Sequence, residues 1–155
     1  KGLIVSYVHN QVCEGMGKIG VLVSLESDSD REQLKDLGKK IAMHVAATNP
    51  ISIDISEIPE ETLEREKKVL SEEARSSGKS EDIVEKMTEG RLRKFYEENV
   101  LLKQTFVIDG ESKVESILNS LDSSVVIKEF VRMEIGEGLV KNEEGFSEEV
   151  SSLLS

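Results

Sequence analysis

The sequence predicts an α+β protein, in which antiparallel-sheet core subdomains with packed helices carry a protruding antiparallel helical hairpin. Three observations lead to this class. Short runs of alternating apolar residues occur near both ends of the chain, helical periodicity fills the middle, and strands and helices do not follow a regular βαβ order.

The first two elements are expected to form a β-hairpin. Apolar residues alternate over 3–8 and over 19–25, and a short glycine-bearing connection joins the two runs. Gly15, Gly17 and Gly20 have the G-x-G-x-x-G spacing of phosphate-binding loops. In a dinucleotide site this triplet opens a helix, whereas a strand follows here. A kinase-type glycine loop does lie between two strands, but no other kinase motif occurs in the chain. We therefore expect a flexible hairpin tip.

A helix should follow over 31–48. Its apolar positions recur three or four residues apart, at Leu34, Leu37, Ile41, Val45 and Thr48. Asp30 is a suitable N-cap, with Gln33 three residues later. The dipeptide Asn49-Pro50 predicts where the helix ends.

The segment that starts "ISIDISEIPEE" is strand-like at first and then helical. Two charged helices are predicted over 60–77 and 81–99, with Gly78 as a left-handed C-cap and Ser80 as an N-cap. Folding them together brings one narrow set of pairs into register: Ala74 with Val84, Leu70 with Met87, Leu63 with Phe95, and Glu66 with Arg91. Because that apolar seam is narrow, a protruding antiparallel coiled coil is favoured over a packed bundle.

Four shorter elements complete the prediction. "TFVID" is a brief strand, 113–121 a short helix, and 145–155 an amphipathic C-terminal helix. A final strand alternates strongly. Its apolar face carries Val125, Ile127, Val131, Met133 and Ile135, with Glu129 as the exception, and the opposite face carries Lys128, Phe130, Arg132 and Glu134.

The net charge of −11 argues against a nucleic-acid partner, because such binding relies on Lys and Arg that neutralise phosphates. Cys13 is the single cysteine, so an intramolecular disulfide is impossible, and no apolar run is long enough for a membrane span. These features predict a cytoplasmic protein without a membrane partner. The sequence starts without Met inside a strand-like run, which suggests a fragment.

No set of residues predicts an active site. His9 and His44 are the only histidines, and with one cysteine they cannot supply a structural zinc site. Convergent acid, base and nucleophile groups are missing, so we expect a non-enzymatic interaction protein without metal or cofactor. His44 lies beside the apolar stripe of its helix, and two interpretations stay open: a half-buried core histidine or a contact exposed to a partner.

Four segments carry a resemblance to a known family, in the order "GKIGVLV", "IAMHVAATNP", "EKMTEGRLRKFYEENVLLKQTFVID" and "FVRMEIGEG". Their order and spacing resemble bacterial elongation factor Ts over essentially the whole chain. That family is the guanine-nucleotide exchange factor of elongation factor Tu in translation. The resemblance implies binding to elongation factor Tu, GDP-bound and nucleotide-free, with no covalent chemistry.

The resemblance also implies a domain organisation. Residues 1–54 would be the later part of the core's N-terminal subdomain, and 55–61 with 98–140 the core's C-terminal subdomain. Residues 62–97 would be the coiled-coil hairpin and 141–155 the C-terminal helix. Position by position, the family's contacts with the nucleotide-binding domain of its partner fall on Ile19, Gly20 and His44. Two interpretations of Met43 stay open, a place on that surface or a place in the core.

The departures from the family concern the N-terminal side. The small helical domain and the T-D-F-V motif that dislodges Mg²⁺ in the family are not in these 155 residues, so we expect poor exchange by this chain alone. The connection 9–17 is longer than the family's tight turn, Met133 replaces a common Phe, and Thr105 a common Pro. The alternative function is a helical-hairpin scaffold that binds another partner through 60–99.

Overall fold

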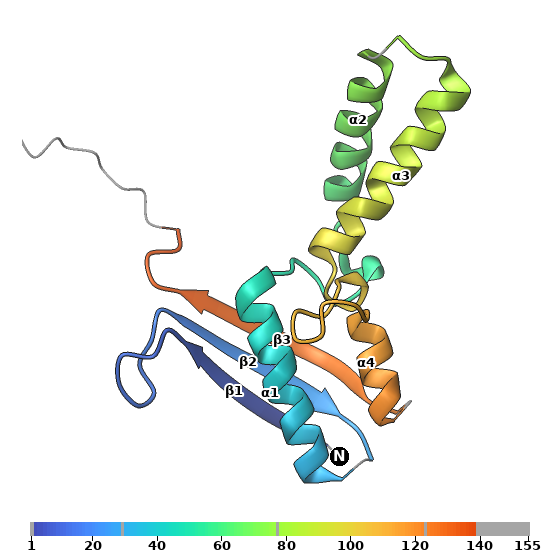
Figure 1. The fold of residues 1–155 in the computed structure, drawn as a ribbon. Helices are drawn as coiled ribbons and strands as arrows, with labels where there is room; N and C mark the ends of the chain where they lie inside the picture. Colours follow the sequence, from blue (N-terminus) through green and yellow to red (C-terminus); the bar gives the residue numbers. More distant parts are fainter. Residues whose placement is uncertain (1, 29, 77, 123, 139–155) are drawn as a thin grey trace, which may run out of the picture.

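The computed structural model describes residues 2–28, 30–76, 78–122 and 124–138, and Figure 1 shows their arrangement. Three antiparallel strands, β1 (Gly2–His9), β2 (Ile19–Glu26) and β3 (Val126–Glu134), form one sheet in the order β1-β2-β3. Helix α1 lies across one face of this sheet, and a pair of helices projects away from it. The predicted α+β class and antiparallel sheet are confirmed.

The β1–β2 hairpin has the predicted strands and a nine-residue connection, 10–18. Two glycines shape that connection in different ways. Gly15 has a φ of +75°, which favours glycine, whereas a Cβ at Gly17 would lie only 2.6 Å from the carbonyl oxygen of His9. The expected role of Gly17 in loop flexibility is therefore wrong, because close packing requires the glycine there. Gly20 lies in a strand and not in a helix, as predicted.

Helix α1 (Arg31–Thr48) begins at the predicted N-cap. The Asp30 carboxylate accepts hydrogen bonds from the backbone N–H groups of Glu32 and Gln33, at 3.0 and 3.2 Å. The helix ends at Asn49, whose backbone is left-handed with φ 46°. A Cβ at Gly38 would lie 2.7 Å from the Val5 side chain, so this glycine lets α1 approach the sheet closely.

One apolar core lies between the sheet, α1 and α4 (Val114–Leu121). Its buried members come from these elements and from the segments that connect them: Val21, Val23, Leu25, Leu34, Leu37, Ile41, Ala42, Val45, Ala46, Ile53, Leu101, Phe106, Val114, Leu118, Val125 and Ile127. The predicted stripe of α1 and the predicted helix 113–121 are confirmed. The opposite face of the sheet is open within the described part of the chain, where Ile4 is 69% exposed.

A β-bulge overturns the predicted faces of the third strand. Leu25 pairs with Ile127 and Ser24 pairs with Glu129, so Lys128 is an extra residue and the alternation reverses after it. Beyond the bulge Phe130 and Arg132 face the helices. The apolar residues predicted to share the face of Ile127 instead lie on the open face or past the strand: Val131, Met133 and Ile135.

Helices α2 (Glu60–Ser76) and α3 (Glu81–Asn99) form the projecting antiparallel hairpin (Figure 1). Among their described residues only Ala74 and Val84 are buried, which matches the narrow predicted seam. Gly78 has the predicted left-handed backbone, with φ +70°. The predicted coiled-coil packing of the pair stays a prediction.

Two details of the hairpin prediction are wrong. The Arg91 guanidinium pairs with Glu73 and not with Glu66, because Glu73 lies on the side of α2 that faces Arg91. Ser80 occupies the N-cap position of α3, but its side chain makes no capping hydrogen bond.

Two predicted strands are absent from the described residues. After α1 the chain makes a single 3₁₀ turn, Ile55–Glu57, capped by Asp54, in place of a strand. The "TFVID" segment is a turn with one isolated bridge between Thr105 and Lys113. In the part of the chain that the structure describes, each run makes only one isolated bridge, Ser52 with Val100 in the first and Thr105 with Lys113 in the second, so neither becomes a strand of the sheet. The predicted C-terminal helix, 145–155, lies outside the described residues, and the predicted domain boundaries stay predictions.

Candidate functional site

Ile19 and Gly20 open strand β2 and point to opposite faces of the sheet, because strand side chains alternate. Ile19 pairs with His9 on one side and Glu134 on the other, is half-buried, and packs against the core beneath α1. Gly20 pairs with Met133 and belongs to the open face. The two predicted contact residues are therefore neighbours in sequence but do not share a surface.

Gly20 lies in a small apolar hollow on that open face. The hollow has a volume of about 170 Å³, and its walls include Val8, Leu22, Val131 and Met133. A Cβ built on Gly20 meets nothing within 4 Å, and its φ is not in the left-handed region. Neither backbone conformation nor packing within the described chain therefore requires a glycine at this position.

Met43 and His44 lie in the second half of α1. Met43 is 39% exposed, which favours the surface interpretation of this residue over the core one. The His44 side chain is fully buried, at 0% exposure, which supports the core interpretation of this histidine over the exposed one. Arg132 of β3 donates to the Ala46 carbonyl oxygen at 3.4 Å, which places the end of α1 over the start of β2.

Both nitrogens of the His44 ring are hydrogen-bonded. Nδ1 accepts from the backbone N–H of Val107 at 3.2 Å, so it carries no proton. Nε2 lies 2.8 Å from the Gln104 side-chain oxygen, to which it donates. This pairing defines a neutral ring with the proton on Nε2. Burial lowers the pKa of His44 below its ordinary value, and the bond with Gln104 opposes that shift only in part.

Gln104 is the centre of this buried network. Its side-chain oxygen also accepts a hydrogen bond from the Thr48 hydroxyl at 3.0 Å, and its side-chain nitrogen donates to the Glu98 carbonyl oxygen at 2.8 Å. The network thus connects the end of α1 with the last turn of α3. The Phe106 ring packs on the His44 ring, with centroids 5.6 Å apart.

The residues after Phe106 form an exposed apolar pair that our sequence analysis missed. Val107 and Ile108 are 44% and 47% exposed. Their loop is closed by main-chain bonds of Phe106 and by the Asp109 carboxylate, which accepts from two backbone N–H groups, those of Glu111 and Ser112. These bonds hold the pKa of Asp109 below its ordinary value. The signal in the sequence was two apolar residues before Asp109-Gly110, typical of a turn.

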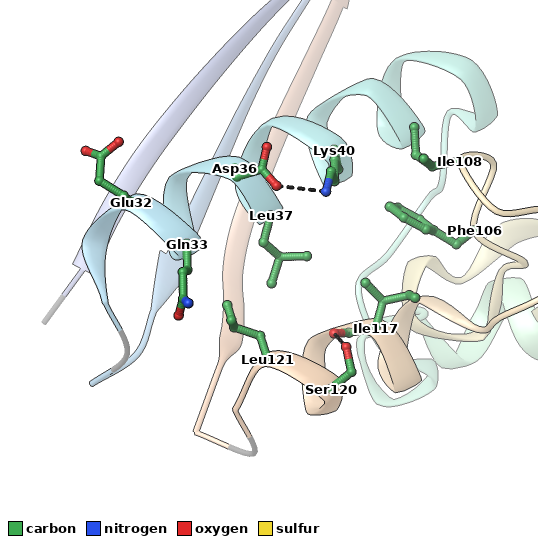
Figure 2. A pocket seen from close by; sticks show the side chains of 10 residues that line it. All are labelled: Glu32, Gln33, Asp36, Leu37, Lys40, Phe106, Ile108, Ile117, Ser120 and Leu121. Atoms are coloured by element: carbon green, nitrogen blue, oxygen red, sulfur yellow. Dashed lines mark hydrogen bonds and ion pairs between the residues drawn. The ribbon is translucent and has the colours of Figure 1, made fainter.

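Ile108 also lines an open groove of about 560 Å³ between α1 and α4, shown in Figure 2. Leu37 and Leu121 extend into it from the two helices, and Phe106 lies at its far end. An ion pair between Asp36 and Lys40, 2.7 Å long, runs along α1 at its rim. An apolar floor with a charged rim is the usual composition of a protein-binding surface.

The described residues give no indication of a metal centre or a membrane span. No group of three His, Cys, Asp or Glu side chains in the described ranges is arranged to hold a metal ion. None of the helices described here is long and apolar enough to cross a bilayer. The candidate contact residues do not form one continuous surface: Gly20 lies on the open face of the sheet, whereas Met43 and the Val107–Ile108 pair lie on the side of α1.

Comparison with known proteins identifies the family. The family model described as Elongation factor TS matches residues 1–137. Three relatives illustrate the similarity, each a protein called Elongation factor Ts. The chain is 51% identical to the one from Rhodospirillum rubrum over 158 residues, which is 99% of this chain and 51% of the relative. It is 50% identical to that of Gluconobacter oxydans, covering 97% of this chain and 49% of the relative.

The protein of Caulobacter vibrioides is 46% identical, over 98% of this chain and 50% of its own length. The chain thus spans about half the length of the curated relatives it matches. Because one family model covers residues 1–137 of 155, the chain belongs to the elongation factor Ts family.

Proposed function

We propose that this chain takes part in translation elongation by binding elongation factor Tu in its GDP form and promoting the release of GDP. Membership of the elongation factor Ts family over residues 1–137 carries the proposal. The exchange activity and the partner come from the resemblance to that family. The chain makes no covalent change in its partner and acts as an exchange factor.

Exchange follows from differential binding. A factor that binds the nucleotide-free GTPase more tightly than the GDP form weakens GDP binding by the same coupling free energy. The factor therefore needs only a surface that fits one state of its partner better than another, and no acid, base or metal of its own. The apolar and hydrogen-bonded character of the candidate site suits this requirement.

Gly20 supports a partner at this end of the molecule. A glycine inside a strand weakens the sheet, and nothing within the described chain requires it, since an added Cβ meets nothing within 4 Å. Close approach of a partner backbone explains the glycine. Ile19 and Met43 lie on the other side of the sheet, with α1, and would add apolar contact there. The buried His44 is proposed to contribute on that side through the residues that it holds.

The test is GDP release from elongation factor Tu, followed by stopped flow with a fluorescent GDP analogue. In a chimera, this chain replaces the matching residues of the Rhodospirillum rubrum relative, so that the T-D-F-V motif of the family is supplied. We expect the chimera to accelerate release. A well-folded chimera that leaves the rate unchanged rejects the proposal.

Two controls accompany this test. This chain alone is expected to bind weakly and to exchange poorly, since it lacks T-D-F-V; full activity of the chain alone would refute that expectation. The chimera with Gly20→Val should fold normally, because the site of the new side chain is open, yet it should accelerate release less.

A further inference from the structure

His44 and Gln104 form a buried joint at which three segments meet: the end of α1, the last turn of α3 and the loop that carries Val107 and Ile108. At 0% exposure the His44 ring has no surface to offer a partner. We infer that His44 is a positioning residue, which holds the exposed Val107–Ile108 pair in the conformation that the partner meets. This inference rests on the proposed function for the identity of that partner.

The hydrogen bond from Val107 is the physical link. Val107 N–H donates to His44 Nδ1 at 3.2 Å, while the Val107 side chain remains 44% exposed. A backbone donor that lost this acceptor would have to turn towards water and carry the exposed side chains with it. The bond therefore fixes the direction in which Val107 and Ile108 point.

The position of the ring is itself fixed from the other side. Nε2 donates to the Gln104 oxygen at 2.8 Å, and Gln104 is anchored through its nitrogen to the Glu98 carbonyl at the end of α3. Thr48, one turn after His44, donates to the same oxygen. The position of the His44 ring, and through it the position of the loop, therefore depends on the base of the hairpin.

The rest of the loop is already rigid. Phe106 N–H donates to the Ser112 carbonyl at 2.7 Å, and Gly110 N–H donates to the Phe106 carbonyl at 2.8 Å. The Asp109 carboxylate caps the turn. Because these bonds close the loop on itself, two neighbouring contacts orient the closed loop on α1: the buried Phe106 side chain and the hydrogen bond from Val107 to His44.

Three substitutions separate the two ring bonds. His44→Asn keeps an acceptor at the place of Nδ1 and loses the bond to Gln104. His44→Gln keeps a donor at the place of Nε2 and loses the acceptor for Val107. His44→Leu loses both. All three should lower the unfolding midpoint, so stability alone cannot distinguish them.

The distinguishing readouts are the amide exchange rate of Val107, measured by NMR, and the affinity for elongation factor Tu with GDP. Loss of one hydrogen bond should raise the Val107 exchange rate about fivefold to tenfold in His44→Gln and His44→Leu. Affinity should fall by a similar factor in the same two variants, while His44→Asn stays close to the unchanged chain. Equal losses of affinity in His44→Asn and His44→Gln would overturn the inference.

A double-mutant cycle tests whether His44 acts through the loop. With Val107 and Ile108 both replaced by Ala, adding His44→Gln should change the affinity no further, because the residues act as one unit. An additive loss would show that His44 contacts the partner itself, contrary to the inference.

Two outcomes distinguish a failure of the proposed function from a failure of the inference about His44. If the unchanged chain does not bind elongation factor Tu, the proposed function fails for this chain, and the Val107 exchange rates still decide whether His44 holds the loop. If every His44 variant unfolds, a nitrogen–nitrogen coupling across the Val107–His44 hydrogen bond in the labelled chain decides it. Absence of that coupling overturns the inference.

Discussion

The core and the helical hairpin of this chain are stabilised in different ways. In the core, the sheet and α1 share a continuous set of buried apolar side chains, with Ile41, Val23 and Leu25 fully enclosed. In the hairpin, Ala74 and Val84 are the only buried residues described, and the rest of the seam is half-buried or charged.

The difference indicates how the two regions serve the proposed function. Binding surfaces need side chains held by a rigid scaffold, and the candidate contacts lie on the core: Gly20 in β2, Met43 on α1 and Val107 in the loop that His44 fixes. The hairpin lacks the burial that makes a rigid unit and is attached at its base through Gln104. We therefore expect the core to carry binding and the hairpin to open more easily.

The largest expected contrast comes from matched truncations. Ile41→Ala should lower the free energy of unfolding by about 2–5 kcal/mol, because it leaves a cavity in a closed core. Leu70→Ala, in the half-buried seam, should cost less than half as much, because water can fill the space. Urea unfolding followed by circular dichroism measures both. Equal losses would mean that the hairpin is packed as tightly as the core.

Two glycine substitutions sharpen the contrast with opposite signs. Gly38→Ala should destabilise the chain by about 1–3 kcal/mol, because the new Cβ would meet the Val5 side chain at 2.7 Å. Gly90→Ala, in the middle of α3, meets nothing within 4 Å and should stabilise the helix by about 0.5–1 kcal/mol. Thermal unfolding of the two variants measures both effects. A stabilising Gly38→Ala would contradict the close packing of α1.

Acidification should lower the stability of the core. The pKa of His44 is lowered by burial, so below its ordinary value of 6.5 the unfolded chain binds a proton that the folded chain does not. Stability should fall as the pH drops from 7.5 through 6.5, until the folded pKa is reached. His44→Gln should remove this part of the pH dependence, while His9→Gln, at an exposed site, serves as the control. Unchanged stability over this range would contradict the burial of a neutral ring.

The smallest effect is expected at the surface of the hairpin. Arg91 pairs with Glu73 between α3 and α2, with both side chains partly exposed. Exposed ion pairs contribute about 0.2–1 kcal/mol and are screened by salt. Glu73→Gln should therefore lower hairpin stability slightly at low salt and have no effect at high salt, as measured by amide exchange within α2. A loss that persists in 1 M salt would point to a packing role for Glu73.

Much of the fold could be predicted because local signals agreed with one another. The Asp30 cap, the stripe of α1 and the Gly78 turn each have a short-range physical cause, and each is found in the structure. The bulge at Lys128 could not be placed from alternation alone, since one extra residue reverses every later side chain. The charged Glu129 on a predicted apolar face was a sign in the sequence that the alternation is interrupted there.

The candidate site was harder to predict than the fold. Ile19 and Gly20 could be named only through resemblance to a family, and the hollow around Gly20 depends on residues from all three strands. The burial of His44 depends on Gln104 and Val107, which are about sixty residues away in sequence. A helical wheel places the ring at the edge of α1 but cannot show what covers it.

The most direct test of the account is the affinity of three proteins for elongation factor Tu with GDP, measured by isothermal titration: the unchanged chain, Gly20→Val, and a deletion of 62–97. The deletion can be closed by a short glycine linker, because α2 and α3 are antiparallel and the start of α2 lies at the same end of the pair as the end of α3 (Figure 1). The account predicts that the deletion keeps its affinity within about threefold, whereas Gly20→Val loses at least about tenfold, or 1.4 kcal/mol. Binding that disappears with the hairpin and survives Gly20→Val would contradict it and favour a hairpin scaffold.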